Sequence, residues 1–217
     1  MNFENTVESI IDKTLKEGAT ACDVVLAASS GKSISCRKQK IEDIEESSEK
    51  IIGVRALIDQ KQAFVSSSQV DKENLDKLVS KCVSMAKQAP DDDTAVLGDS
   101  EFFETNISDL DLFQKDETDT QMLVDSVMEC EDAALSVEGI TNSEGAGASF
   151  STGEFFLATS NGFRGGYKSS GNSISCSVLA GEGQSMERDY ETSSAIYFDD
   201  LACLLYTSDA ADDLRGG

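Results

Sequence analysis

Few residues of this sequence could catalyse a reaction or bind a metal ion, and the absence of histidine is the main reason. The 217 residues contain no histidine, so a Ser-His-Asp triad, a Cys-His pair or an HExxxH-type zinc site cannot be built from this chain alone. Serines cluster at Ser66–Ser68, Ser169–Ser170 and Ser193–Ser194, but none lies in a G-x-S-x-G elbow. We therefore expect no catalytic residue and no metal ligand in this chain.

The cysteines, glycines and acidic runs point to no cofactor either. The six cysteines form no CxxC pair and lie in apolar or strand-like patterns, which favours buried free thiols over the alternative of disulfides. No G-x-G-x-x-G follows a predicted strand, so a nucleotide site is disfavoured. Asp91–Asp93 is followed by no calcium-loop spacing, and solvated charge is favoured over a calcium or magnesium site.

Two strand-like stretches hold residues typical of binding surfaces. Arg55 is the one charge inside the apolar run Ile51–Ile58, so it either pairs with a carboxylate in a structural role or contacts a peptide or partner. Alternation places Met186, Arg188 and Tyr190 on one face of a strand, where they offer a donor and an aromatic ring to a passing backbone. The alternative for Arg188 is a plain cross-strand ion pair.

Residues 118–202 are predicted to form a helix followed by an antiparallel meander. Thr118 and Gln121 fit a capping box that opens the helix, and Gly139 is expected to end it. Asn161-Gly162 is the strongest hairpin signal, because a type I′ turn needs positive φ at both central residues. The predicted elements of the meander are the strand Phe155–Ser160, the turn Asn161-Gly162, a return strand through Tyr167, a polar break at Ser169–Asn172, the strand Ile174–Ala180, a turn at 181–183 and the strand Met186–Phe198.

Residues 1–90 are predicted to form a first domain of helix, meander and helix. The first helix ends at Gly18, and the second is capped by Asp71 and stopped by Pro90. The predicted elements are a helix over 2–17, a strand over 24–28, a turn over 29–32, strands over 33–40, 44–49, 51–58 and 63–67, and a helix over 71–87.

These patterns predict an α+β fold: two helix-plus-antiparallel-sheet units joined by an acidic linker. The predicted domains are an N-terminal α+β domain over 1–90, the linker over 91–117 and an incomplete middle region over 118–202. Residues 203–217 look like translated read-through, and we expect them to be a non-native tail on a fragment of a longer protein. The residues singled out for substrate or partner binding are Arg55, Asn161, Gly162, Met186, Arg188 and Tyr190.

The charge of the chain limits its partners. There are 41 acidic and 18 basic residues, a formal net charge of −23, which repels nucleic-acid phosphates and anionic lipid. The sequence contains no transmembrane-length apolar run, and residues 1–30 lack the pattern of a signal peptide. We expect a cytoplasmic protein that binds neither nucleic acid nor membrane.

Several segments together resemble a known family. Ile140–Gly145 (ITNSEG), Thr159–Phe163 (TSNGF), Ser173–Ala180 (SISCSVLA) and Met186–Tyr190 (MERDY), with Leu110–Phe113 (LDLF) upstream, are similar to the PmbA/TldE branch of the TldD/PmbA family. The resemblance extends from about residue 21 to about residue 201. In that family a TldD subunit and its PmbA/TldE partner form a metalloprotease that processes peptides and degrades small unfolded proteins.

The resemblance implies a division of labour between two subunits. The metal motif HExxxH belongs to the TldD subunit, so zinc is expected only in a TldD-like partner and not in this chain. The implied partners are a TldD-like subunit, or a second copy in a dimer, and a peptide or unfolded-protein substrate. Our first interpretation is a non-catalytic part that assembles the protease and encloses its substrate. The alternatives are a binding or scaffold module without a proteolytic partner, and an enzyme whose site is completed beyond residue 202.

Overall fold

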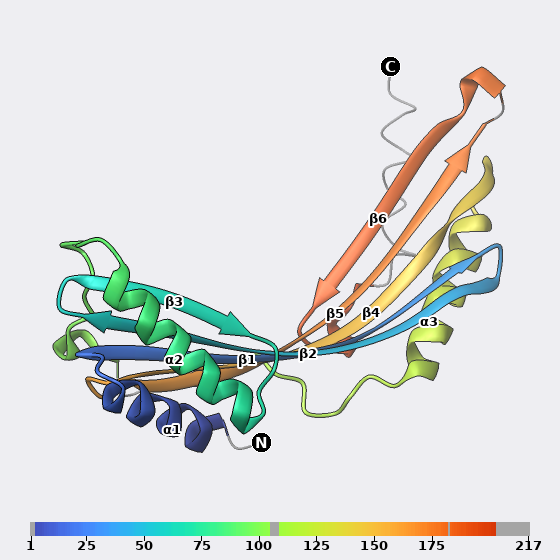
Figure 1. Cartoon of the computed structure of the whole chain (residues 1–217). Coiled ribbons are helices and arrows are strands. Elements are labelled where there is room, and N and C mark those ends of the chain that lie inside the picture. Colours follow the sequence, from blue (N-terminus) through green and yellow to red (C-terminus); the bar gives the residue numbers. More distant parts are fainter. Residues whose placement is uncertain (1–2, 105–108, 182, 203–217) are drawn as a thin grey trace. The chain divides into compact units, whose positions relative to one another are not determined.

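A computed structural model describes residues 3–104, 109–181 and 183–202 of the chain (Figure 1). Its secondary structure is a set of helices and one antiparallel sheet, which confirms the predicted α+β class. The elements, in chain order, are α1 (Phe3–Lys16), β1 (Ala21–Arg37), β2 (Lys40–Ile58), β3 (Lys61–Ser67), α2 (Lys72–Gln88), η1 (Ser100–Phe102), α3 (Thr120–Leu135), β4 (Ile140–Thr159), β5 (Arg164–Ala180), η2 (Gly183–Ser185), β6 (Glu187–Ala195) and η3 (Phe198–Asp200).

The strands form one six-stranded sheet in the order β3-β2-β1-β4-β5-β6. The register pairs Ile58 with Lys61 in the hairpin of β2 and β3, and Leu179 with Arg188 between β5 and β6. β3 and β6 are therefore the edge strands of the sheet. None of the helices in the described ranges is long and apolar enough to cross a membrane.

The chain divides into two compact units, and each is assembled from stretches far apart in the sequence. Unit 1 consists of residues 1–29, 48–110 and 153–168, and unit 2 of residues 30–47, 111–152 and 169–217. The strands β1, β2, β4 and β5 each contribute residues to both units. The contact-defined units thus differ from consecutive domains over 1–90 and 118–202, because long strands share their residues between two helix-covered cores.

Unit 1 has its core between the sheet and the helices α1 and α2, which lie on the same face of the strands in Figure 1. α1 contributes Val7, Ile10 and Ile11 to this core, as its helical period predicts. Alternate residues of the strands pack in the same core. Val24 and Val54 are two of these, and both are completely buried. α2 begins as predicted, since the Asp71 side chain accepts a hydrogen bond from the Asn74 N–H.

Unit 2 has its core between α3 and the sheet. Leu123 and Val127 of the helix pack against Ile34 and Phe150, among other strand residues. The predicted cap at Thr118 is wrong: the N-cap is Asp119, whose side chain accepts from the Met122 N–H. Thr118 is instead buried, and its hydroxyl donates to Asn172 Oδ1 at 2.9 Å.

Predicted interruptions of the sheet are also wrong. The strands predicted separately over 44–49 and 51–58 form the single strand β2. Residues 29–32 form no turn but continue β1, and residues 169–172 form no break but continue β5. Their small polar side chains interrupt the apolar pattern at the points where these strands pass from one unit to the other. Backbone pairing, which does not depend on apolar side chains, continues through both stretches.

The hairpin at Asn161-Gly162 is confirmed, but its geometry differs from the prediction. Only Gly162 has positive φ, at +110°, so the turn is not of type I′. Positive φ at two successive residues occurs instead at Lys38 and Gln39, with 52° and 58°, between β1 and β2. That turn lacks the usual Asn-Gly signal, and contacts from α3, described below, hold it in place.

Candidate functional site

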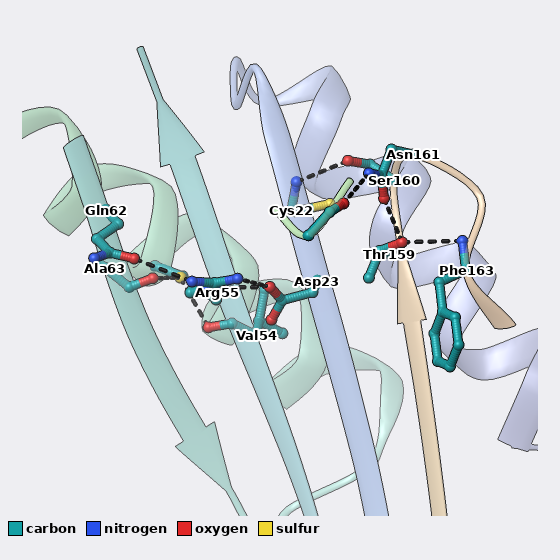
Figure 2. A network of polar contacts seen from close by, with 12 residues as sticks. Cys22, Asp23, Val54, Arg55, Gln62, Ala63, Thr159, Ser160, Asn161 and Phe163 are labelled. Carbon is teal, nitrogen blue, oxygen red and sulfur yellow. Dashed lines mark hydrogen bonds and ion pairs between the residues drawn. The ribbon is translucent and has the colours of Figure 1, made fainter. Parts of the chain in front are cut away.

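Arg55 lies in a chain of polar contacts on unit 1 (Figure 2). Its Nε donates to Asp23 Oδ2 at 2.7 Å, and its Nη1 donates to Gln62 Oε1 at 3.3 Å. Gln62 in turn donates to Asp92 Oδ2 at 2.7 Å, and the pKa of Asp92 is lowered by the hydrogen bonds from Thr94 and Gln62. Arg55 thus has an internal carboxylate partner, the structural alternative considered from the sequence.

Asn161 lies in the loop that connects β4 to β5 (Figure 2), and Gly162 is the next residue of that loop. The Asn161 amide accepts from the Thr159 hydroxyl at 2.6 Å and donates to Gly98 O at 2.8 Å. Beside the loop, Ser160 N donates to Cys22 O at 2.8 Å, and Cys22 N donates to Ser160 Oγ at 3.0 Å. The side-chain polar groups of Asn161 therefore bind within the loop and to residue 98, while Ser160 connects the loop to residue 22.

The edge strand β6 of unit 2 contains Arg188 and Tyr190, and Met186 directly precedes it. Met186 is 54% and Tyr190 71% exposed. Arg188 forms an ion pair with Glu144, and its Nε donates to Ser177 Oγ at 3.1 Å. Arg55 and Asn161 belong to unit 1, so the residues singled out from the sequence are divided between the two units.

Small hydroxyl side chains cover the sheet face of unit 2 that lies opposite α3. Ile174, Cys176 and Val178 of β5 pack towards α3, so alternation turns the intervening serines to the opposite face. Across β6 the register pairs these serines with Ser194, Thr192 and Tyr190. We call this surface the hydroxyl face, and its members are Ser149, Ser173, Ser175, Ser177, Thr192 and Ser194.

The hydroxyl face is suited to hydrogen bonding rather than to nucleophilic attack. The hydroxyl oxygens of Ser149 and Ser173 are 2.8 Å apart, and the Ser177 hydroxyl donates to Glu144 Oε2 at 2.8 Å. The hydrogen bond from Ser177 and the charge of Arg188 hold the pKa of Glu144 below its usual value. A carboxylate of lowered pKa is a poor general base near neutral pH. Glu144 is therefore not suited to activate the Ser177 hydroxyl as a nucleophile.

Glu131 is the polar residue that the sequence-based reasoning missed. It is completely buried, and its carboxylate accepts from Lys38 N at 2.8 Å, from Gln39 N at 2.7 Å and from the Ser143 hydroxyl. Burial alone would raise the pKa of Glu131, but the hydrogen bonds from Gln39, Ser143 and Lys38 outweigh it and lower the pKa. The available signal was its position four residues after Val127, on the buried face of α3.

The described cysteines form no disulfide with one another, as predicted from their spacing. The buried thiols are those of Cys22, Cys36, Cys82, Cys130 and Cys176; Cys203 lies outside the described residues. Burial raises the pKa of Cys22 to about 12 and that of Cys36 to about 11. Among the described residues no group of three or more His, Cys, Asp or Glu side chains is arranged to hold a metal ion.

Comparison with known families supplies the identity of the fold. Residues 22–86 match the family model described as PmbA/TldA metallopeptidase domain 1, and residues 114–215 match its central domain. The chain belongs to the PmbA/TldD family. The central-domain match includes most of the tail over 203–217, which lies outside the described residues, and the foreign origin of that tail stays a prediction.

Curated relatives belong to the PmbA branch of the PmbA/TldD family. The chain is 30% identical over 200 residues to a Haemophilus influenzae protein named metalloprotease PmbA homolog, covering 92% of this chain and 44% of the relative. It is 28% identical over 169 residues to metalloprotease PmbA of Escherichia coli O157:H7, covering 77% and 38%. The chain therefore spans less than half of the length of the curated relatives that it matches.

Solved structures share the PmbA/TldD-family fold. A Bacteroides thetaiotaomicron protein described as a candidate modulator of DNA gyrase matches with a TM-score of 0.82 and 23% identity, covering 98% of this chain and 49% of its own. TldE from Thermococcus kodakarensis matches with a TM-score of 0.74 and 13% identity, covering 88% and 43%. At these identities the likeness is one of fold.

Proposed function

We propose that this chain is the PmbA/TldE-type subunit of a TldD/TldE-type metalloprotease that acts on peptides and small unfolded proteins. In this proposal the described region is non-catalytic: it assembles with a TldD-like subunit and helps to enclose the substrate in the cytoplasm. The observation that carries the proposal is the joint match to domain 1 and the central domain in a chain of 217 residues without histidine. Zinc is then supplied by the HExxxH motif of the partner.

The hydroxyl face is the surface on which we expect the substrate or the partner subunit to lie. It presents small hydrogen-bonding groups beside the exposed ring of Tyr190, and aromatic residues of this kind often dominate the binding energy of an interface. The acidic net charge of −23 supports a protein partner over nucleic acid. Arg55 and Asn161 remain predicted contacts, although their polar groups already have internal partners.

Association with a TldD-like subunit tests this assembly role. Light scattering of the protein mixed with a TldD-like subunit that carries HExxxH is expected to give a defined complex. Tyr190→Ala is expected to weaken that association about tenfold, which corresponds to roughly 1.4 kcal/mol. Tyr167→Ala is the matched control, because Tyr167 is also an exposed tyrosine, at 56%, but belongs to unit 1.

Each outcome of this experiment has a consequence for the proposal. Association that is weakened by the Tyr190 variant and unchanged by the Tyr167 variant supports the assembly role and its assignment to the hydroxyl face. Equal association of all three proteins removes the hydroxyl face from the proposal. A failure of the unmodified protein to associate would favour the scaffold alternative, and one tightly bound zinc per chain after chelator washing would contradict the non-catalytic role.

A further inference from the structure

The edge strand β3 turns unpaired backbone groups away from the sheet. β2 and β3 are joined by a two-residue loop, with Ile58 paired to Lys61 and Leu57 paired to Gln62. Leu57 O accepts a hydrogen bond from Thr20 N at 2.8 Å, on the side of β2 opposite β3. Pair 57–62 is thus a non-hydrogen-bonded pair, and from there the pairs alternate. Gln62 and Phe64 therefore point their N–H and C=O groups to the outer edge, where the described chain places no further strand.

A groove lies directly beside this edge, between β3 and α2. The groove is open to solvent and has a volume of about 450 Å³. Met85 of α2 is 46% exposed and gives the groove an apolar wall. The lining residues are Gln62, Ala63, Phe64, Lys81, Ser84, Met85, Gln88 and Ala89.

The charge of the groove is opposite to that of the molecule. Lys81 is the one charged residue among the described lining residues, whereas the whole chain carries a net charge of −23. The acid next to the lining is Asp92, and its carboxylate accepts hydrogen bonds from the side chains of Gln62 and Thr94. An occupant with a carboxylate would meet a lysine here, while elsewhere on the surface it would meet mostly other carboxylates. A basic segment would have a less favourable electrostatic interaction here than on the acidic remainder of the surface.

We propose that the groove between β3 and α2 binds an extended polypeptide segment that carries alternating apolar and acidic residues. The segment adds a strand to β3 through the outward N–H and C=O groups of Gln62 and Phe64, the mode of recognition known as strand addition. Side chains on one face of the added strand contact Met85 and the methyl groups of Ala63 and Ala89. A carboxylate of the segment lies near the Lys81 ammonium group.

A synthetic probe tests this site without any other subunit. The probe is a fluorescein-labelled heptapeptide of alternating valine and glutamate residues, and its binding is measured by fluorescence anisotropy. Lys81→Glu is expected to weaken binding at least tenfold. Lys72→Glu is the matched control, because it makes the same charge change on the same helix at a residue outside the groove.

Two further probes test the proposed backbone contacts and the preferred charge. The same heptapeptide with N-methylated alternate amides cannot donate the hydrogen bonds of an added strand, so its binding is expected to be lost. A valine–lysine heptapeptide is expected to bind at least tenfold more weakly than the valine–glutamate probe. Equal binding of these three peptides would overturn the proposal.

Hydrogen exchange of single amides gives a structural readout of the same event. On saturation with the valine–glutamate probe, the amides of Gln62 and Phe64 are expected to gain protection. The amides of Ala63 and Val65, which face β2, are expected to change little. Absence of saturable binding would contradict the proposal, as would concentration-dependent protection of Gln62 and Phe64 without peptide, since the occupant would then be a second copy. Neither result touches the proposed role with a TldD-like subunit, which is measured separately.

Discussion

At the scale of single residues, Glu131 connects α3 to two other parts of unit 2. Its buried carboxylate receives hydrogen bonds from the turn at Lys38 and Gln39 and from Ser143 of β4. The turn residues both have positive φ, a conformation that costs a non-glycine residue roughly 1–2 kcal/mol. Two backbone donors aimed at one buried carboxylate offset that cost, so the acid on α3 stabilises the hairpin of β1 and β2.

The first prediction replaces this acid by its neutral amide. Glu131→Gln is expected to lower the free energy of unfolding by about 2–3 kcal/mol, because a charged acceptor is lost and a buried amide hydrogen is left without an acceptor. Glu129→Gln, at an exposed position of the same helix, is the control and is expected to change stability by less than about 0.5 kcal/mol. Urea unfolding of the two variants and the parent protein measures the difference, and equal midpoints would refute the role of Glu131.

The second prediction concerns pH. The pKa of Glu131 is lower in the folded protein than its ordinary value of 4.5, so the folded state binds this proton less tightly than the unfolded state. Its stabilising contribution is fully present above about pH 5.5 and is lost as the pH falls through the folded-state pKa. The stability difference between the parent and Glu131→Gln is therefore expected to be constant near neutral pH and to shrink below pH 4.5. A difference that grows on acidification would contradict the direction of the pKa shift.

At the scale of elements, the close approach of β4 to β1 depends on a glycine. Gly145 has a φ of +122°, and a Cβ added there would lie 2.7 Å from Cys36 O. Gly139 also has positive φ, at +96°, but an added Cβ would meet nothing within 4 Å. The two positions therefore share the conformational strain of a side chain and differ in the steric contact.

The third prediction uses this pair of glycines. Gly139→Ala is expected to cost about 1 kcal/mol from the positive φ alone, and Gly145→Ala is expected to cost at least about 1 kcal/mol more. The additional cost arises because either the backbone of β1 or that of β4 must move to relieve the contact with Cys36 O. Thermal or urea unfolding of the two variants measures the difference. Equal losses would show that the clash at Gly145 is relieved without cost.

Much of the element structure could be predicted from periodicity, and the errors have a common physical cause. The helical period and the cap at Asp71 were sufficient to predict the helices α1 and α2, because these signals are local. The continuity of β1 through residues 29–32 was missed, because a paired strand tolerates small polar residues that look like a turn in isolation. The choice of Asp119 as the cap of α3 follows from the burial of Thr118 against Asn172, a contact over 54 residues.

The candidate site was harder to predict than the fold. Alternation correctly gave an exposed aromatic ring and an arginine on β6, but the partners of Arg188 are Glu144 and Ser177 on other strands. The hydrogen-bond partners of Arg55 and Glu131 are likewise set by strand order and by turn position, which no local pattern encodes. The hydroxyl face emerged only when the register aligned β5 with β6.

At the scale of the whole molecule, membership of the PmbA/TldD family and the absence of histidine together define the central claim. These 217 residues contain no histidine, so they cannot supply an HExxxH zinc site. We propose that proteolysis by a complex needs this protein for assembly and substrate enclosure, and needs a TldD-like subunit for zinc.

The measurement that tests this claim most directly is the cleavage of an unfolded protein by the separate subunits and by their mixture. We predict no cleavage by this protein alone, cleavage by its mixture with a TldD-like subunit, and loss of that cleavage when the glutamate of the partner's HExxxH motif is replaced by glutamine. Cleavage of the substrate by this protein alone, in a preparation free of any TldD-like subunit, would contradict the account.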